Sequence, residues 1–544
     1  MADPTPFLTH DTTDQNPVSD SSSLSENPHL CITIKDLGSE NPQIDPQNPF
    51  EFLGVDGFCV PTSTTADPFR NHTLKISGFY EWVKILICIP IAAIRLVIFG
   101  LTLLVGYVVT LIAIHGWKDK HNPMPRWRSN LMWVTRLCAR CILFSFGYQW
   151  IKRKGRPAPR EVAPIVVSNH VSYIDPIFFF YELFPTIVAS DSHDSMPLVG
   201  TIIRAMQVIY VNRFSSSSRK NAVNEIKRKA SCKRFPRVLL FPEGTTTNGK
   251  FLLSFQMGAF IPNKPIQPVI VRYPHVHFDQ SWGNISLARL MFRMFTQFHN
   301  YMEVEYLPVI RPMQSQKENV SLFAERTAHA MATSLNLVQT SYTYGDMLLL
   351  MKAVELKQEN PSRYMVELGH INSSYRINTM EALEFLEKFI SMNPDDSGSV
   401  QIEDFLRALR LKPCGLSEKI FSFVDIEKMG KITFKQFLLA SNHIMKQPLF
   451  QRACEFSFVK CGDGIQDHIL NKEFGDAIRL SIPDANEHDV KELFNMFDMD
   501  RDGKIQKHEF LGCLRRNPLL IALFSPLLQV EFAQTSNGLL EEMV

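Results

Sequence analysis

The longest apolar stretch of the chain is residues 85–114, which read ILICIPIAAIRLVIFGLTLLVGYVVTLIAI. From Leu96 to Ile114 it runs for nineteen residues without a charge, close to the roughly twenty that a helix needs to cross a bilayer. A stretch this long and apolar predicts membrane insertion. Pro90 and Arg95 interrupt its first half. Two arrangements therefore stay open: one span that starts near Leu96, or a hairpin of two half-helices that enters and leaves by the same face.

Basic residues follow this stretch and indicate its orientation. Eleven lysines and arginines lie between residues 118 and 160. They predict that this side faces the cytosol, where they would attract anionic headgroups. A second apolar stretch, Leu131–Trp150, is interrupted by Arg136 and Arg140. We expect it to be an interfacial amphipathic helix rather than a second span, so residues 85–150 form the predicted membrane region.

The N-terminal region has a different composition. Residues 1–70 carry eleven acidic and two basic side chains and are rich in Pro, Ser, Thr and Asn, which predicts a disordered acidic tail. They contain no apolar run, so we expect no secretory signal. The ten cysteines of the chain lack the spacing of a disulfide framework, and reduced thiols are the simplest interpretation.

The rest of the chain divides into two parts, as a length of 544 residues suggests. Residues 155–345 alternate short β-rich runs, such as APIVVSNH and RVLLFPEG, with helical stretches, the pattern of an α/β domain with a largely buried sheet. Beyond about residue 345 the β-runs disappear. Helix–loop–helix units then repeat at roughly 32–37 residues over residues 376–520, and residues 521–544 are expected to be a C-terminal tail.

His170 and Asp175 stand where the strand-like APIVVSNH runs into VSYIDPIFFF. Histidine is the side chain that suits general-base catalysis near neutral pH. A carboxylate on its far ring nitrogen would fix the tautomer and stabilise the imidazolium that forms. The four intervening residues leave room for a turn that folds Asp175 back onto His170. Taken alone, such a pair is more often a structural histidine and a helix N-cap.

Three further elements follow in order. Arg213 ends the strand-like QVIYVNR, and its guanidinium has the shape to clamp a phosphate. In VLLFPEGTTTNGK, Gly244 permits a close approach of the backbone to a ligand, while Glu243 and Thr245 offer polar contacts. Pro268 lies in the apolar IQPVIVRY. Each element by itself is typical of a strand end or a turn.

Together and in this order, the four elements resemble the motifs of the glycerolipid acyltransferases, which acylate glycerol phosphate and lysophospholipids. The resemblance implies an α/β acyltransferase domain whose mixed sheet is flanked by helices. It also implies that His170 is the general base and that Asp175 orients it. The substrate-binding residues that the resemblance implies are Asn169, Arg213, Glu243, Gly244, Thr245 and Pro268.

The resemblance further implies that the lysophospholipid hydroxyl attacks the thioester of acyl-CoA directly. No acyl-enzyme is expected, because nothing near His170 resembles an activated serine or cysteine nucleophile. A basic segment, residues 219–237, is either a solvated helix face or a patch for membrane or coenzyme A phosphates. It lacks interleaved aromatic residues, so no nucleic acid is expected as a partner.

Residues 498–509 read DMDRDGKIQKHE and have the complete ligand pattern of an EF-hand calcium loop. Hard carboxylate oxygens, a turn glycine (Gly503) and a closing bidentate glutamate are what calcium requires. We therefore predict that Ca²⁺ binds to one loop. The predicted ligands are Asp498, Asp500, Asp502, Lys504 through its backbone carbonyl, and Glu509.

The other helix–loop–helix units are weaker candidates. Residues 393–404 close with an aspartate, which is shorter and weakens bidentate coordination. Residues 425–436 end in Gln436, which predicts a structural partner, and residues 462–473 have glycines where acids belong, which predicts an empty loop. The weak ligand set of the first loop is Asn393, Asp395, Ser397 and Asp404.

An acyltransferase domain followed by EF-hands resembles the lysophospholipid acyltransferases of eukaryotic endomembranes. Segments such as DPFRN, LFSFGYQW and MQVIYVNRFS look closest to the plant lysophosphatidylethanolamine acyltransferases that carry EF-hands. The resemblance implies lysophosphatidylethanolamine as acceptor, with lysophosphatidylcholine or lysophosphatidate as alternatives. It places the protein in the endoplasmic reticulum, Golgi or late endosome, with its catalytic domain cytosolic and calcium as a modulator. A calcium-responsive membrane scaffold with an inert acyltransferase domain is the alternative of another class.

Overall fold

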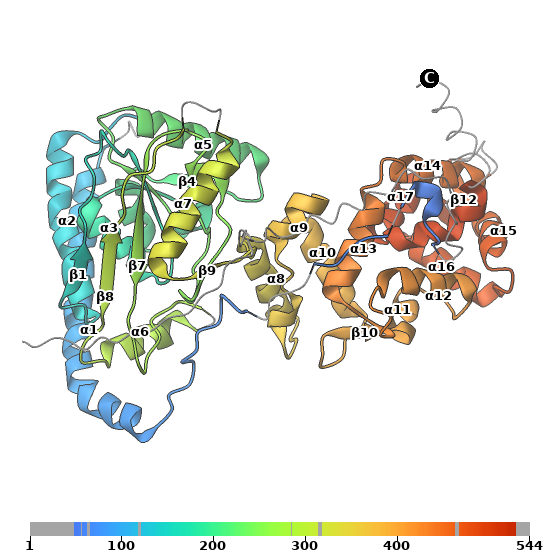
Figure 1. Cartoon of the computed structure of the whole chain (residues 1–544), viewed down its shortest axis with the longest axis horizontal. Helices are drawn as coiled ribbons and strands as arrows, with labels where there is room; N and C mark the ends of the chain where they lie inside the picture. Colours follow the sequence, from blue (N-terminus) through green and yellow to red (C-terminus); the bar gives the residue numbers. More distant parts are fainter. Residues whose placement is uncertain are drawn as a thin grey trace, which may run out of the picture. The chain divides into compact units, whose positions relative to one another are not determined.

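The β-rich runs form a seven-stranded sheet in the order β1-β8-β7-β2-β5-β3-β4 (Figure 1). Neighbouring strands are parallel except for β7 and β8, which are antiparallel. The sheet is therefore mixed, and the predicted α/β fold is confirmed. The strands are β1 (Ile151–Lys154), β2 (Ile165–Ser168), β3 (Thr186–Ser190), β4 (Ile209–Val211), β5 (Val238–Leu240), β7 (Ile266–Arg272) and β8 (Met302–Tyr306).

The computed structural model describes residues 48–528, except residues 56, 62–65, 118–120, 284, 314–317 and 463–466. Most of the predicted acidic tail and residues 529–544 of the predicted C-terminal tail lie outside the described residues.

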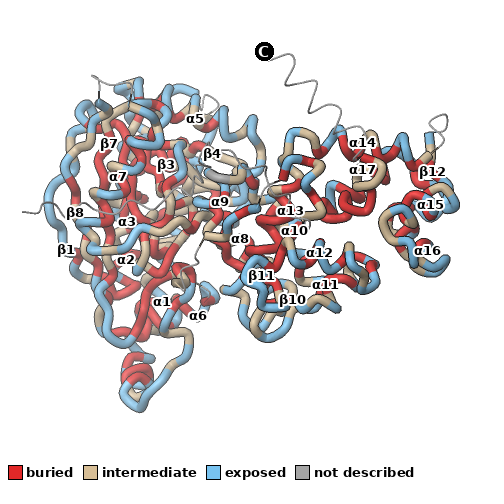
Figure 2. The backbone as a smooth tube through the Cα atoms, turned by 45° about the vertical axis from the view of Figure 1, so that its right-hand side comes forward, coloured by how far each residue is buried: buried red, intermediate tan, exposed pale blue. Residues whose placement is uncertain are grey.

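Helices cover both faces of the sheet because successive strand residues point to opposite faces. Val166 and Leu239 pack in one core with α3 (Ile174–Leu183) and α6 (Leu287–Phe295). Their neighbours in the strands, such as Val167 and Leu240, pack in a second core with α5 (Ser216–Ser231) and α7 (Val320–Leu335). The central strands are consequently buried on both faces (Figure 2). The smaller elements of this domain are η2 (Asp191–Ser195), α4 (Val199–Ala205), β6 (Phe251–Leu252), η3 (Met257–Ala259) and β9 (Val338–Gln339).

The predicted membrane stretch is part of one continuous helix, α1 (Phe79–Ile114), with Pro90 inside it. The alternative of two half-helices is therefore wrong. Arg95 is buried against the domain, where its guanidinium donates to the backbone oxygens of Phe295 and Phe298, each at 2.9 Å. These contacts hold the first half of α1 on the end of α6.

The second half of α1 packs along α2 (Arg126–Ser145). Gly106 makes the close approach possible, since a side chain there would meet Cβ of Cys138 at 3.3 Å. Thr110 and Thr135 meet through their hydroxyls at 3.3 Å. The outer face stays apolar: α1 exposes large side chains from Phe79 to Ile112. Among the described residues, α1 is the one helix long and apolar enough to cross a membrane.

The C-terminal part contains four helix–loop–helix units in two pairs. Strands β10 (Ser399–Gln401) and β11 (Lys431–Thr433) join the first two loops, and β12 (His468–Leu470) and β13 (Lys504–Gln506) join the last two. EF-hands form such pairs through the short strand of each loop, so the predicted EF-hand region is confirmed. Its helices are α10 (Thr379–Ser391), α11 (Ile402–Ala408), α12 (Gly415–Val424), α13 (Phe434–Met445), α14 (Phe450–Cys461), α15 (Asn471–Ser481), α16 (Glu487–Phe497) and α17 (Lys507–Arg516).

Short helices connect the two parts of the chain. These are α8 (Tyr344–Glu355), η4 (Pro361–Tyr364) and α9 (Leu368–Tyr375). α8 begins with a capping box in which Thr343 and Asp346 bind each other's backbone N–H groups. The fully buried Asp346 also accepts the N–H groups of Val366 and Leu368, which fixes α8 against the chain that follows it.

Both predicted tails, residues 1–70 and 521–544, include residues that are folded in the structure. The described residues before residue 70 do not form a disordered tail, because η1 (Glu51–Leu53) and the segment after it bury Phe50, Val55 and Phe58 in the EF-hand core. At the other end, η5 (Pro518–Phe524) is fully buried in the same core. In the N-terminal segment, apolar side chains gain more by burial than the polar composition around them suggests, whereas η5 reads PLLIALF and its own apolar composition favours docking on the EF-hand core.

Candidate active site and candidate calcium site

The polar residues singled out in the sequence follow the carboxyl ends of parallel strands. His170 comes after β2, Arg213 after β4, and the FPEGT segment at residues 241–245 after β5. Tyr273 directly follows β7. Ligands of open α/β sheets bind at this edge, because the loops that carry functional side chains meet there. Three of the four motifs are thus brought to one edge of the sheet.

His170 and Asp175 form a hydrogen-bonded pair. Nδ1 of His170 lies 2.9 Å from Oδ2 of Asp175. The same carboxylate oxygen accepts the backbone N–H groups of Val171 at 2.8 Å and Ser172 at 2.9 Å. The Asp175 side chain is completely buried, whereas 18% of the His170 side chain is exposed. With Nδ1 engaged by the carboxylate, Nε2 is the ring nitrogen left for a substrate proton.

The ring of Phe241 lies on the imidazole of His170. Their centroids are 4.1 Å apart and their planes are inclined by 19°. Phe241 is held in turn by the edge of Phe179 from α3, at 6.1 Å. The imidazole is therefore confined both by Asp175 at Nδ1 and by an aromatic ring on one face. The motif match gives no reason to expect this stacking.

Glu243 and Asn169 bind backbone rather than open space. Both side chains are buried. The carboxyl group of Glu243 accepts the N–H of His170 at 3.0 Å and that of Leu253 at 3.1 Å. The amide of Asn169 donates to O of Val271 at 2.9 Å and accepts its N–H at 2.8 Å. These contacts position the turn that carries His170. Because both side chains are buried, neither offers a surface to a substrate, and their predicted role in substrate binding stays a prediction.

The pKa of Glu243 is raised to about 8, chiefly by burial and to a smaller extent by the nearby charge of Asp175, while the backbone N–H groups of His170 and Leu253 oppose the shift. The cause is desolvation, since a completely buried carboxylate loses its hydration. A carboxyl group that changes its charge near neutral pH therefore lies directly behind the His170 turn.

Gly244, Thr245 and Arg213 gather at the start of α8. Gly244 has φ +78°, a conformation that favours glycine, and a side chain there would lie 3.6 Å from Cβ of Tyr344. The guanidinium of Arg213 lies over the ring of Tyr344, 4.2 Å from its centroid. The hydroxyl of Thr245 contacts Sδ of Met347 at 2.7 Å. Tyr344 stands outside the motifs, so the sequence alone could not place it here.

Pro268 lies inside the sheet. It is buried in β7 in register with Val167 of β2, and its carbonyl accepts the N–H of Leu307 at 3.0 Å. The structure therefore places it beneath the strand ends, and its predicted role at the acyl-CoA site stays a prediction.

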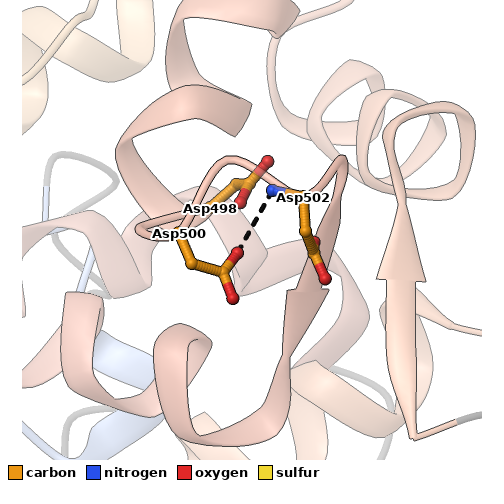
Figure 3. Close-up of side chains that lie close together, drawn as sticks. All are labelled: Asp498, Asp500 and Asp502. Carbon is orange, nitrogen blue, oxygen red and sulfur yellow. Dashed lines mark hydrogen bonds between the residues drawn. The ribbon is translucent and has the colours of Figure 1, made fainter.

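Asp498, Asp500 and Asp502 converge in the loop between α16 and α17, as Figure 3 shows. One carboxylate oxygen from each lies within 4.8 Å of the others. The N–H of Asp502 donates to Asp500 at 3.2 Å, and the N–H of Gly503 donates to Asp498 at 3.0 Å. Gly503 has φ +83°, as the sharp turn of such a loop requires.

The donor set fits calcium. Oδ1 of Asp498 is a buried oxygen without a hydrogen-bond partner, and a buried acceptor of this kind calls for a cation. The closing residue, Glu509, is buried and accepts the N–H groups of Met499 at 2.9 Å and Gln506 at 2.9 Å. It therefore reaches back across the loop. Lys504, the predicted backbone ligand, begins β13.

The loop at residues 393–404 is a poorer site. Oδ1 of Asp395 is taken by the N–H of Ser397 at 2.8 Å and by its hydroxyl at 2.5 Å. The carboxylate of Asp404 forms an ion pair with Arg407 at 2.6 Å. Asn393 stands at the start of the loop with φ +63°. A calcium ion here would have to compete with Arg407 for the closing carboxylate.

Comparisons with known proteins match both folded parts of the chain. An acyltransferase family model matches residues 151–272, and an EF-hand domain pair matches residues 473–517. The chain is 59% identical over 97% of its length to a lysophospholipid acyltransferase, LPEAT2, of Arabidopsis thaliana, and covers 99% of that protein. It is 29% identical to lysophosphatidylcholine acyltransferase 2 of Mus musculus, over 86% of each chain.

Among solved structures, the 1-acyl-sn-glycerophosphate (LPA) acyltransferase PlsC of Thermotoga maritima aligns with a TM-score of 0.34 at 16% identity. The alignment covers 47% of this chain and 96% of that one.

Proposed function

The chain belongs to the lysophospholipid acyltransferases, and we propose that it transfers a fatty acyl group from acyl-CoA to lysophosphatidylethanolamine with His170 as general base. The observation that carries the proposal is the hydrogen bond of 2.9 Å between Nδ1 of His170 and the buried Asp175. It lies at the carboxyl edge of the sheet, where substrates of such folds bind. The relative that matches nearly the whole chain is named a lysophospholipid acyltransferase, LPEAT2, and supports a lysophospholipid as the acceptor.

In the proposed reaction, Nε2 of His170 takes the proton of the lysolipid hydroxyl as its oxygen attacks the thioester carbonyl carbon. The carbon–sulfur bond then breaks. The departing thiolate of coenzyme A receives the proton from His170, so that an ester and a free thiol are the products. Asp175 stabilises the imidazolium that exists between the two proton transfers.

Arg213 is the proposed contact for the phosphate of the acceptor. Arg213 is partly exposed, and its guanidinium lies over the ring of Tyr344, a cation–π contact that restrains the side chain. The turn at Gly244, beside the same tyrosine, supports an approach of the ligand to the backbone. Arg213→Lys keeps the charge and loses the planar fork. We expect it to raise the KM for the lysolipid more than it lowers kcat.

The acceptor is tested with membranes that contain the full-length chain, labelled acyl-CoA and a panel of lysophospholipids. We expect the highest kcat/KM with lysophosphatidylethanolamine, and membranes with Asp175→Asn provide the blank. A preference for lysophosphatidylcholine or lysophosphatidate would overturn the proposed acceptor and leave the mechanism standing. No transfer to any lysolipid would favour the scaffold alternative.

We propose that α1 embeds the protein in an endomembrane with the catalytic domain on the cytosolic side. The exposed apolar face of α1 supports this, as does the exposure of Trp127, Trp133 and Phe144 on α2, since tryptophan is enriched at membrane interfaces. Extraction at alkaline pH tests insertion: the protein is expected to stay with the membrane pellet. A protease added outside sealed vesicles is expected to remove the catalytic domain, and full protection would reverse the orientation.

Calcium modulation is proposed from contacts that link the EF-hands to the active-site loops. The last residue of α17, Arg516, accepts a hydrogen bond at 3.2 Å from Lys388 of α10. The neighbouring Glu387 forms an ion pair at 2.7 Å with Lys352 of α8. The first residue of α8 is Tyr344, on which Arg213 stacks. A shift of α17 on calcium binding would thus have a physical route to the proposed phosphate contact.

Two further contacts come from the segment before α1, one on each side of residues 62–65, which lie outside the described residues. Phe58 packs on Phe423 of the EF-hand core, with ring centroids 5.4 Å apart. Ten residues later, the carbonyl of Pro68 accepts the N–H of Asn248 at 2.7 Å, in the loop that follows FPEGT. Acyl transfer is therefore to be compared in chelator and in micromolar calcium. Equal rates would exclude modulation and reduce the loop at residues 498–509 to a structural role.

A further inference from the structure

The two oxygens of Asp175 have different surroundings. Oδ2 accepts three donors from the turn that carries His170, namely Nδ1 of His170 and the N–H groups of Val171 and Ser172. Oδ1 accepts the phenolic hydroxyl of Tyr273, which is 98 residues away in the sequence. Among the described residues, the contact with Tyr273 is the one that reaches the carboxylate from outside this turn, and it ties the carboxylate to the end of β7.

Tyr273 is held where it can make this contact. It directly follows β7, whose residue Val271 is bound on both backbone groups by Asn169. Its side chain is 8% exposed. Its ring meets that of Tyr148 edge to face, with centroids 6.1 Å apart. The hydroxyl of Tyr148 is engaged elsewhere, by Gln280 at 2.5 Å, so the two tyrosines have separate polar partners.

Burial and the nearby charge of Asp175 raise the pKa of Tyr273 well above its usual value. The phenol therefore remains protonated and acts as a donor over the whole range in which the enzyme would work. The titratable groups that face Asp175 come from four parts of the domain. They are His170 before α3, Tyr148 before β1, Glu243 after β5 and Tyr273 after β7. Tyr173, at the N-cap of α3, lies near Tyr148 and Tyr273.

We propose that Tyr273 is a positioning residue for acyl transfer, acting on His170 through Asp175. The inference rests on the proposed general-base function of that pair. The hydroxyl holds the plane of the carboxylate, so that Oδ2 meets Nδ1 of His170. It also draws negative charge onto Oδ1 and away from the imidazole, because a hydrogen bond to an ionised group stabilises the charge near the donor.

These two effects have distinct signatures. Loss of the hydroxyl frees the carboxylate to turn, which lowers kcat. It also leaves the carboxylate charge uncompensated in a buried site, so the imidazole holds its proton to higher pH. Since only the unprotonated imidazole can accept the lysolipid proton, the acid limb of the pH–kcat profile moves to higher pH. A purely structural contribution to packing would not move this limb.

The test uses full-length protein in membranes with Tyr273→Phe. We expect kcat to fall by about 10- to 100-fold, the range for a hydrogen bond to a charged group. We expect the KM for acyl-CoA and the KM for lysolipid to change by less than about twofold, since Tyr273 is buried and its hydroxyl is engaged by Asp175. The acid limb should shift upward. Tyr148→Phe removes a buried hydroxyl that is hydrogen-bonded to Gln280 and not to Asp175, and should leave the limb in place.

A second variant covers the case in which Tyr273→Phe does not fold. Fluorotyrosine at position 273 keeps the ring and the hydroxyl but makes the phenol a stronger donor, so the acid limb should move to lower pH, opposite to the Phe variant. The proposal is overturned if the acid limb of the pH–kcat profile does not move in whichever of the two variants folds. It is also overturned if Tyr273→Phe has an unchanged kcat. If the Tyr273 proposal is overturned, Asp175→Asn shows whether the proposed general-base function fails as well. An active Asp175→Asn means that the general-base function fails too. An inactive Asp175→Asn means that only the role of Tyr273 fails.

Discussion

The carboxyl group of Glu243 accepts the backbone N–H of His170 at 3.0 Å, so the glutamate of one motif holds the histidine of another. Burial raises the pKa of this carboxyl from 4.5 to about 8. Between these values the unfolded chain has lost the proton and the folded chain retains it. The free energy of unfolding must therefore fall as the pH rises through this window, by at most about 1.4 kcal/mol per pH unit.

Glu243→Gln has no proton to lose and is expected to flatten this slope. Thermal unfolding of the detergent-solubilised protein between pH 5 and 8 measures it. As the pH rises, the Tm of the wild type should fall steadily relative to the Tm of Glu243→Gln. Glu403→Gln on the exposed face of α11 is the control and should follow the wild type. Parallel curves for wild type and Glu243→Gln would show that the buried carboxyl does not titrate in this range.

Asp175→Asn should preserve the fold and abolish most of the activity. The amide oxygen can still accept the three donors that now reach Oδ2, and the amide nitrogen can donate to the Tyr273 oxygen once that hydroxyl turns. The negative charge beside the imidazole is lost. By analogy with hydrolase triads, kcat should fall by about 10⁴. Asp191→Asn, at an exposed position of η2, is the control for handling and expression. Near-normal turnover in Asp175→Asn would contradict the mechanism.

The site residues that could be predicted are those whose position follows from local sequence. A β-rich run ending in a polar residue places that residue at the strand end, and parallel strands bring such ends together. In the same way, the twelve-residue spacing from Asp498 to Glu509 defines a calcium loop without knowledge of the rest of the fold. The mixed sheet and the EF-hand pairs agree with these expectations.

What could not be predicted depends on contacts between distant segments. Tyr273 and Tyr344 belong to none of the motifs, and the packing of β7 and α8 brings them to the site. Phe50 and Phe58 lie in a polar, acidic stretch without periodicity, and only their contact with Phe423 shows that they belong to the EF-hand core. The motif match indicates that Glu243 lies near the site. It does not tell whether the side chain points to a substrate or to backbone.

Phe241→Leu tests the stacking on His170. Phe241 is only partly buried, so its truncation should cost little stability. The imidazole would lose the flat surface that restrains it, and kcat should fall by about tenfold, since small misplacements of a catalytic group are costly. The matched variant is Phe260→Leu in the core beneath α7, where Phe260 is 1% exposed and meets Phe323 at 5.5 Å. It should lower Tm and leave the kcat of the folded protein unchanged. The reverse pattern would show that Phe241 is a packing residue only.

Glu509→Gln and Glu473→Gln compare the closing positions of the two paired loops. Both glutamates cap the helix that follows their loop through a backbone N–H, from Gln506 and Leu470 respectively. Among the residues that the structure describes, which leave out 463–466 of the other loop, only Glu509 closes a loop with three converging aspartates and an unsatisfied buried oxygen, that of Asp498. A ligand present at 100 times its Kd stabilises a folded protein by about 2.7 kcal/mol. Added calcium should therefore raise the Tm of wild type and of Glu473→Gln to a similar extent. The rise should be largely lost in Glu509→Gln, because a neutral amide cannot provide the bidentate carboxylate. An equal loss in both variants would mean that the cap, and not a calcium ligand, had been removed.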